Sequence, residues 1–477
     1  MRTFGNLLAF SPELWLLAGA IVILVTGRFR NGATTTMVAL VTLLLAFAAL
    51  ATQFKQTITI LDGAFLLDGF AIVLDVVILA STALVLLVGS GDVLPGDRDS
   101  GSVPGLVLLA ALGAMLAVSA AEMISLFLAL ELLAISFYLL AALVRRGPGS
   151  IGVSLGYAIV GGTASGLLLY GLALMFGLTG QTQLHAAGIA LRDTAPNQPA
   201  VMLMLSLLIA GFALRVGLVP LRWWARGFEV GVALRVVVLV QSVGAVTALA
   251  VFGRVLGSTL AGTRIPYAPV LAVLAAMMMI GGMLLAVTQV SLRGMLLYAT
   301  VAQAGFALAA FTDLSRLGLT ALLVFLVAMA LTTITAFSAV IAYSRSVHSD
   351  AIRDLAGIST PTPGVALALG LALLSLAGFP PLAGFLGRLL IVQATVEGGY
   401  GWLAVIEILS IVIGTIGFMR VLRTVFIDPP IYEVIPVRLG TGVRAALGLA
   451  CAGMVFMGLL LGPLFSAASY GRSAILH

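Results

Sequence analysis

The sequence is poor in the side chains that usually carry chemistry. It holds one lysine, Lys55, one cysteine, Cys451, and three histidines, His185, His348 and His477. A single cysteine excludes a disulfide framework and a cysteine-ligated cluster within this chain. No spacing of histidine, cysteine or carboxylate matches a metal-ligand pattern, and no glycine-rich dinucleotide turn is present. We therefore expect no metal site and no catalytic residue in this chain.

Charge is also scarce. Asp, Glu, Lys and Arg make up 9% of the 477 residues, and 61% of the residues are hydrophobic. The mean hydropathy is +1.21. A soluble domain carries about 25% charged residues, so the composition predicts an all-α polytopic membrane protein.

Fourteen apolar stretches approach the about 20 residues that a bilayer-spanning helix needs. The stretch at 362–396 is long because Pro380 and Pro381 divide it into two halves. The first stretch lacks a basic flank and a following soluble domain, so we interpret it as a retained helix rather than a signal peptide. The predicted helices lie near 12–27, 33–52, 68–90, 104–121, 123–144, 152–178, 200–220, 228–253, 267–288, 292–311, 316–344, 362–396, 401–427 and 442–466.

The net charge of +6 comes from arginines spread over short loops, which argues for membrane topology rather than for nucleic-acid binding. With the amino terminus outside, fourteen arginines fall in loops on the cytoplasmic side. Seven basic residues then fall on the outer side, with Arg254 among these loop residues. Basic residues favour cytoplasmic loops, so we predict that both termini lie outside.

No linker or low-complexity segment divides the chain, which predicts a single transmembrane domain over 1–477. Helix 7 is broken at Pro220 and helix 12 at Pro380-Pro381, five spans later. Paired broken helices point to internal repeats with an ion or substrate site at their interface, although a break is sometimes only a bend that improves packing. The predicted parts are N-terminal helices 1–3 in 1–103, repeat helices 4–8 in 104–255, repeat helices 9–13 in 267–427, and helix 14 in 442–477.

Glu131 lies in the middle of the predicted helix at 123–144, with no charge within eight residues on either side. Desolvation penalises the charged form of a buried carboxyl, so an isolated glutamate here would hold a proton. A partner such as Arg215 would keep it ionised. Glu131 is therefore either a proton-path carboxylate or one half of a static buried salt bridge.

Other polar groups also lie inside predicted helices. Arg388 follows the Pro-Pro break near mid-span, so we expect a buried partner for it, with Glu407 as the candidate. Gln241 and Gln303 supply amides. Such amides bind a chain of water molecules or form hydrogen bonds between helices, and the sequence leaves both roles open.

Asp68 and Asp75 are seven residues apart, which places them on one face of the predicted helix at 68–90. Asp68 falls near the membrane surface. Asp75 is deeper and needs a partner that the sequence does not name.

Four segments resemble subunit N of proton-translocating NADH–quinone oxidoreductase (respiratory complex I), an antiporter-like membrane family. The most specific match is RDLAGISTPTPGVALALGLALLSLAGFPPLAGFLGR at 353–388. LFLALELLAISFYLLAAL at 126–143, GFALRVGLVPLRWWARGFEVG at 211–231 and VSLRGMLLYATVAQAGF at 290–306 are also similar to family segments. The resemblance covers nearly the whole chain.

This resemblance implies two inverted five-helix repeats, broken helices 7 and 12, and a central line of glutamate, lysines and histidine that carries protons. Arginine keeps its proton because its pKa exceeds about 12, and alanine and glutamine do not titrate. Among the residues that occupy this central line in the present chain, only the glutamate can therefore change its charge. The helix 5 glutamate is Glu131, the helix 7 lysine is Arg215, the histidine after that helix's proline is Arg222, the helix 8 lysine falls near Ala245, the helix 10 histidine is Gln303 and the helix 12 lysine is Arg388.

The resemblance implies a membrane-arm subunit of a proton-translocating NADH–quinone oxidoreductase-like complex in a bacterial inner (cytoplasmic) membrane. It implies no cofactor in this chain; flavin, iron–sulfur clusters and quinone would reside in partner subunits. The expected partners are the other membrane-arm and peripheral subunits and the lipid bilayer, with no nucleic acid. The subunit then either passes protons, with a weakened path, or is a non-pumping structural and electrostatic scaffold. A cation/proton antiporter module and an unrelated transporter with broken helices remain as alternatives.

Overall fold

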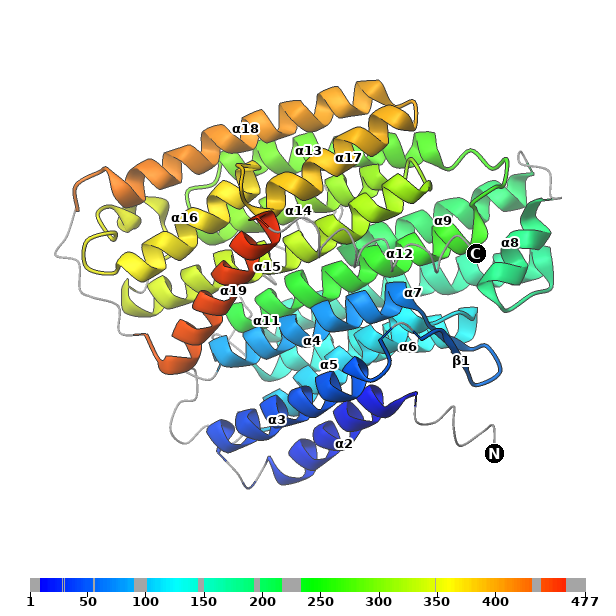
Figure 1. Cartoon of the computed structure of the whole chain (residues 1–477), viewed down its shortest axis with the longest axis horizontal. Helices are drawn as coiled ribbons and strands as arrows, with labels where there is room; N and C mark the ends of the chain where they lie inside the picture. Colours follow the sequence, from blue (N-terminus) through cyan, green and yellow to red (C-terminus); the bar gives the residue numbers. More distant parts are fainter. Residues whose placement is uncertain are drawn as a thin grey trace. The chain divides into compact units, whose positions relative to one another are not determined.

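The computed structural model describes residues 9–27, 29, 31–54, 56–89, 101–144, 150–192, 198–216, 233–347, 349–430 and 439–459. Over these residues the chain is almost entirely helical, as its composition predicts (Figure 1). It divides into two compact units, one formed mainly by residues before 268 and the other mainly by residues 268–465.

The first unit contains most of the N-terminal half of the chain. Its β-hairpin joins β1 and β2 in antiparallel register, with Ile58 opposite Leu67. The sequence did not predict this hairpin, because its strands are only three residues long. The elements are α2 (Ser11–Thr26), α3 (Gly32–Ala51), β1 (Ile58–Ile60), β2 (Phe65–Leu67), α4 (Gly69–Gly89), α5 (Val103–Ser119), α6 (Met123–Leu143), α7 (Ser150–Thr179), α8 (Leu184–Arg192), α9 (Pro199–Val216), α11 (Leu234–Leu239), the π-helix η3 (Val240–Gly244) and α12 (Ala245–Thr259).

The second unit is built from long helices joined by short turns. In it α13 packs along α14, α15 contacts α16, α17 and α19, and α18 contacts α13 and α16 (Figure 1). Its elements are α13 (Ala268–Val287), α14 (Leu292–Ala310), α15 (Arg316–Val347), the 3₁₀ helix η4 (Ile352–Leu355), α16 (Pro363–Ala377), α17 (Ala383–Glu397), α18 (Gly401–Phe426) and α19 (Thr441–Leu459).

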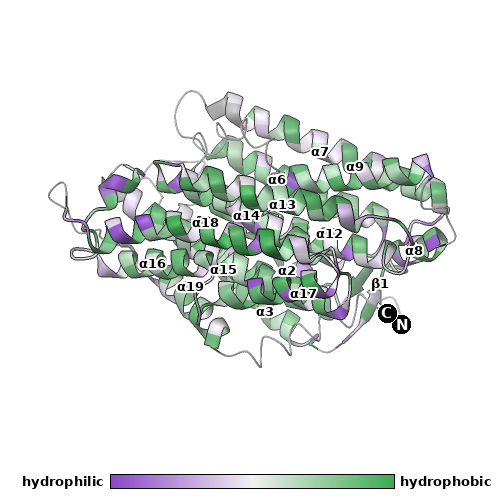
Figure 2. Ribbon diagram, turned by 90° about the horizontal axis from the view of Figure 1, so that it is seen from above, coloured by the Kyte–Doolittle hydropathy of each residue, from purple (hydrophilic) through white to green (hydrophobic). Residues whose placement is uncertain are grey.

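The helices have the length and surface of membrane spans. Among the described residues, eleven helices are long and apolar enough to cross a bilayer, and α2, α5 and α16 are shorter apolar helices. Figure 2 shows hydrophobic residues along the helices and hydrophilic ones concentrated towards helix ends and connections. Met37 and Leu44 on α3, and Val405 and Ile416 on α18, are more than half exposed. Such surfaces suit lipid, so the multi-pass membrane fold is confirmed, whereas the fourteen-span count and the inverted repeats remain predictions.

The break in helix 12 is as predicted. α16 ends at Ala377, and Gly378 takes the left-handed conformation with φ of 75°. Pro380 and Pro381 lie between this residue and the start of α17. The two halves approach closely, since a Cβ added to Gly384 would lie 2.2 Å from the Ser375 carbonyl oxygen. The break therefore holds two short helices in contact rather than separating them.

Helix 8 is not a uniform α-helix, which the sequence did not predict. Between α11 and α12 the chain forms five residues of π-helix, Val240–Gly244, including Gln241. Single π turns inside α-helices occur frequently at functional sites. Gly244 lies against the ring of Phe137, which is 2.6 Å from the position of an added Cβ. This glycine lets the π turn sit close to α6.

One loop assignment was wrong. Arg254, predicted in an outer loop, lies inside α12 and is 2% exposed. Its Nη2 is 2.7 Å from Oδ1 of Asp68, and its guanidinium lies over the Phe70 ring at 5.1 Å. The sequence suggested that the charge of Arg254 must face water. The helix instead continues past Arg254, because the buried carboxylate of Asp68 compensates this charge.

Gly113 controls the contact between α5 and α6. A Cβ added there would meet the Leu133 backbone nitrogen at 2.6 Å. Backbone cannot move aside as a flexible side chain can, so Gly113→Ala should lower stability by about 1–3 kcal/mol, the usual cost of overpacking. The measurement is the midpoint of thermal unfolding of the purified full chain in detergent. Gly162→Ala in α7 is the matched control, because nothing lies within 4 Å of its added Cβ; equal midpoints for the two variants would contradict the packing argument.

Candidate functional site

The clearest polar site in the first unit joins α6, α7 and α9. Nη2 of Arg215 lies 2.6 Å from Oε1 of Glu131, as the sequence predicted for this pair. The Ser165 hydroxyl donates to the same Oε1 at 2.5 Å and accepts from Nη2 of Arg215 at 3.0 Å. Nη1 of Arg215 donates to the Leu130 carbonyl oxygen at 3.3 Å. We refer to Glu131, Arg215 and Ser165 as the central triad.

Local sequence explains how the triad forms. Glu131 lies mid-way along α6, and α7, which carries Ser165, packs against both α6 and α9. Arg215 lies in the last turn of α9. A cation there is favoured by the partial negative charge of the helix C-terminus. The side chain of Arg215 is 9% exposed and that of Glu131 is 24% exposed, so Glu131 is the less buried member of the pair.

Sequence reasoning missed Ser165 and two tyrosines near the triad. Tyr138 lies seven residues after Glu131, hence on the same face of α6, and interacts electrostatically with Glu131 and Arg215. Its ring packs edge-to-face on that of Tyr157 of α7, with ring centroids 5.4 Å apart. The seven-residue spacing from Glu131 was the signal available in the sequence for Tyr138. Hydroxyl groups that flank a carboxylate can pass a proton to it or take one from it.

The second unit holds a buried arginine that forms no ion pair with a carboxylate of the described residues. Arg388 in α17 is 3% exposed, and its guanidinium lies over the Phe306 ring of α14 at 4.9 Å. Its Nε and Nη1 have no hydrogen-bond partner among the described residues. Both carboxylate oxygens of Glu407 in α18 are likewise buried and without a hydrogen-bond partner there. The predicted pairing of Arg388 with Glu407 is therefore wrong; an aromatic face takes the place of the carboxylate.

Hydroxyl and amide groups lie on the helices around Arg388. Gln303 is one turn from Phe306 on α14, is 3% exposed, and its Nε2 has no hydrogen-bond partner among the described residues. Thr332 of α15 and Ser375 of α16 share a hydrogen bond of 2.9 Å, and the Ser375 hydroxyl accepts from the Gly384 amide at 3.2 Å. These contacts fix the broken helix 12 to α15.

The remaining predicted site residues are placed as follows. Gln241 is half-buried within the π-helix, and Ala245, where the family has a lysine, is buried at the start of α12. Pro220 and Arg222 lie outside the described residues. Neither Gln241 nor Ala245 can gain or lose a proton near neutral pH, so helix 8 supplies no titratable group at these positions.

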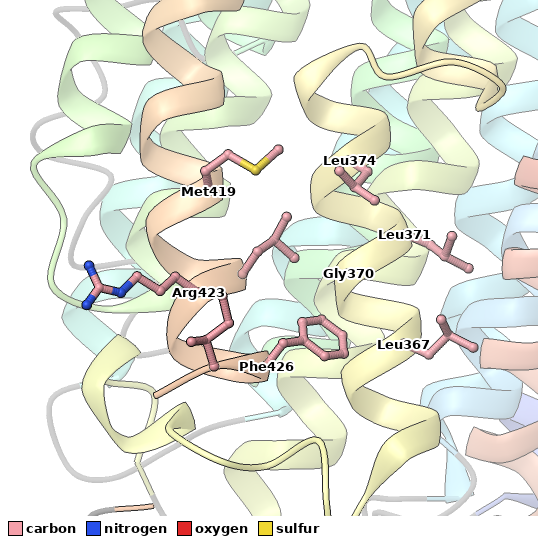
Figure 3. Close-up of a pocket in the computed structure, with 9 residues that line it drawn as sticks. Leu367, Gly370, Leu371, Leu374, Met419, Arg423 and Phe426 are labelled. Carbon is pink, nitrogen blue, oxygen red and sulfur yellow. The ribbon is translucent and has the colours of Figure 1, made fainter. Parts of the chain in front are cut away.

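An apolar pocket of about 340 Å³ lies between α16 and α18. Figure 3 shows the guanidinium of Arg423 pointing away from the apolar side chains that face the pocket. Arg423 pairs with Asp428 at 3.2 Å, and the pocket contains none of the predicted site residues. The lining residues are Leu367, Gly370, Leu371, Leu374, Met419, Leu422, Arg423, Phe426 and Ile427.

Comparisons with known proteins agree with this geometry. The family model described as NADH:quinone oxidoreductase/Mrp antiporter, TM, matches residues 120–414, which is more than half of the chain. The chain is 29% identical over 469 residues to NADH-quinone oxidoreductase subunit N of Acidithiobacillus ferrooxidans, covering 98% of each protein. It is 31% identical over 486 residues to the subunit N of Dehalococcoides mccartyi, covering 98% of this chain and 99% of that one.

The structural comparison leads to the same family. A chain of respiratory complex I from Thermus thermophilus, solved with bound aureothin, superposes with a TM-score of 0.78 and 26% identity. The superposition covers 95% of this chain and 98% of that one. The matched residues 120–414 include Glu131, Arg215 and Arg388. The chain therefore belongs to the NADH:quinone oxidoreductase/Mrp antiporter family of membrane subunits and, within it, to subunit N of the NADH-quinone oxidoreductases.

Proposed function

We propose that this chain is the membrane-arm subunit N of a proton-translocating NADH-quinone oxidoreductase-like complex in a bacterial cytoplasmic membrane. The observation that carries the proposal is Glu131, a titratable carboxylate held inside the apolar bundle by Arg215 at 2.6 Å. Intramembrane ionisable residues with a defined partner mark ion paths more often than other residues do. Both termini lie on the outer side, as the distribution of loop arginines favours.

In this proposal the chain is part of an enzyme without carrying its redox chemistry. One cysteine provides too few thiolate ligands for an iron–sulfur cluster. Flavin, iron–sulfur clusters and quinone belong to partner subunits, and the chain contacts other membrane-arm and peripheral subunits. Its own contribution is to hold and move protons within the bilayer.

The central triad suggests how Glu131 would exchange a proton. While Arg215 lies against Glu131, the guanidinium compensates the charge of the carboxylate. When the two separate, Arg215 remains charged, and the desolvated carboxylate becomes neutral by taking a proton. The Ser165 hydroxyl, which contacts both groups, and the nearby Tyr138 hydroxyl are the neighbours through which that proton can pass. Opening the ion pair would thus protonate Glu131, and closing it would deprotonate Glu131.

The alternative is a non-pumping scaffold in the same complex. It is favoured by Arg388, which keeps its charge under Phe306 where the family has a lysine, and by Gln303 and Ala245 at two further positions of the usual line. These residues preserve charge or packing without exchanging protons. The two proposals differ in whether Glu131 titrates during turnover.

Co-purification tests membership of the complex. The tagged full chain, extracted from native membranes in mild detergent, should bring down a flavin- and iron–sulfur-containing arm, and the eluate should oxidise NADH with a quinone. Recovery of other membrane subunits without a redox arm would instead identify a cation/proton antiporter module and would overturn the proposal.

Charge-neutral substitutions separate pumping from scaffolding. Glu131→Gln alone strands a buried arginine, which typically costs about 3–5 kcal/mol, and should impair assembly. Glu131→Gln combined with Arg215→Gln removes both charges and should restore assembly. If Glu131 carries protons, the assembled double variant should translocate fewer protons per electron than the wild type. The readout is the proton-to-electron ratio in proteoliposomes; an unchanged ratio would leave the scaffold as the function.

Arg388→Lys tests whether arginine weakens the path. A buried lysine can release its proton, whereas arginine cannot, so this variant should raise the proton-to-electron ratio measured in the same proteoliposomes. Arg423→Lys, a change of the same kind at the Asp428 ion pair, is the control and should leave the ratio unchanged. An equal effect of both substitutions would show that the change acts through assembly rather than through the path.

A further inference from the structure

A group of buried charges away from the central triad is drawn from α2, α12 and the segment that leads into and begins α4, all in the first unit. It comprises Glu13, Asp68, Asp75 and Arg254, which are 5%, 0%, 0% and 2% exposed. Oδ1 of Asp68 accepts from Arg254 at 2.7 Å and from the Ala71 amide at 2.8 Å. Asp68 and Arg254 therefore form a complete pair.

Asp75 has no such pair. It lies seven residues after Asp68, about two helical turns further along one face of α4, and both of its carboxylate oxygens are buried without a hydrogen-bond partner among the described residues. Oε2 of Glu13 is buried in the same way. Asp75 interacts electrostatically with Glu13, Arg254 and Asp68, so Glu13 and Asp75 share one environment.

The charges of this group do not balance if every carboxyl is ionised. Among the described residues of this group there are three carboxyl groups and one guanidinium, so full ionisation would leave two more negative charges than positive ones. The helices that pack on α2, namely α3 and α5, carry no titratable residue, and Arg254 is the titratable residue of α12. Burying an unpaired carboxylate is far more costly than protonating it. Two nearby carboxyls that compete for protons also titrate as a pair.

Both residues lie near the beginnings of their helices. Glu13 is the third residue of α2 and Asp75 the seventh of α4. At 1.5 Å per residue, both lie within about 10 Å of the starts of their helices. The pair is thus near one membrane face, and by the predicted topology this is the outer face. A proton needs only a short path between the pair and the water at that face.

We propose that Glu13 and Asp75 form a second proton-binding site, which takes up and releases a proton at the membrane face where α2 and α4 begin. The ligand is a proton rather than a metal ion, because no group of three histidine, cysteine or carboxylate side chains in the described part of the chain is arranged to hold a metal, and the positive Arg254 opposes a bound cation. Uptake converts one carboxylate into a carboxylic acid and involves no electron transfer. Asp68 and Arg254 anchor the site without exchanging the proton.

Infrared spectroscopy tests this proposal on the full chain in lipid nanodiscs, without electron transfer. The C=O stretch of protonated carboxyl groups is followed while the pH is raised from mildly acid to mildly alkaline. The wild type should show a band that disappears over this range. Asp75→Asn and Glu13→Gln should each remove it or shift the pH at which it disappears. Glu407→Gln, which alters another buried carboxyl, should retain it.

Three outcomes overturn the proposal. In the first, the spectra of both variants coincide with the wild type. In the second, the band persists at every pH, which makes the acids permanently neutral. In the third, it responds to added sodium at constant pH, which makes the site a sodium site. If the variants do not fold, the wild-type chain with ¹³C-labelled aspartate carboxyls provides the test. Its titrating band should shift relative to the band of the unlabelled chain. Failure of the subunit N proposal would leave this result unaffected, since no partner subunit is present.

Discussion

Every charged group inside this bundle must be compensated, because an unpaired ion in an apolar interior costs several kilocalories per mole. The chain meets this constraint in different ways. Glu131 and Arg215 form an ion pair supported by Ser165. Asp68 and Arg254 form a fully buried pair that joins α4 to α12. Arg388 lies against the face of Phe306, which compensates a cation less completely than a carboxylate does. The positions of the helices around these groups follow from the partners that the charges require.

These solutions differ in how readily they can change. In a carboxylate–arginine pair only the carboxylate can gain or lose a proton, because arginine stays charged. Any change in the charge of the pair therefore occurs at the carboxylate. A guanidinium on an aromatic ring has no titratable member at all. The first unit therefore combines its buried charges with carboxyl groups that can exchange protons, whereas at Arg388 the charge in the second unit is fixed.

The sequence predicted features that depend on one segment and failed where distant segments meet. Apolar length and proline placed the helices and the break at Pro380-Pro381, since both act locally. The Glu131–Arg215 pair was predictable because each residue is isolated in an apolar stretch and the family resemblance places them together. Arg254 was misplaced because the sequence does not show that Asp68, 186 residues away, will neutralise it. Arg388 was assigned to Glu407 because sequence reasoning looked for an opposite charge and overlooked Phe306.

The π turn at Val240–Gly244 has a consequence for how this chain can vary. Such a turn contains one residue more than an α-helical turn would, and it holds that residue without interrupting the helix. Leu234–Thr259 therefore continues as one span through the turn. Removal of one residue within this segment would convert it to regular α-helix and leave Arg254 on the side of the helix that meets Asp68. The chain can thus differ in length by one residue at this turn and still keep the Arg254–Asp68 pair.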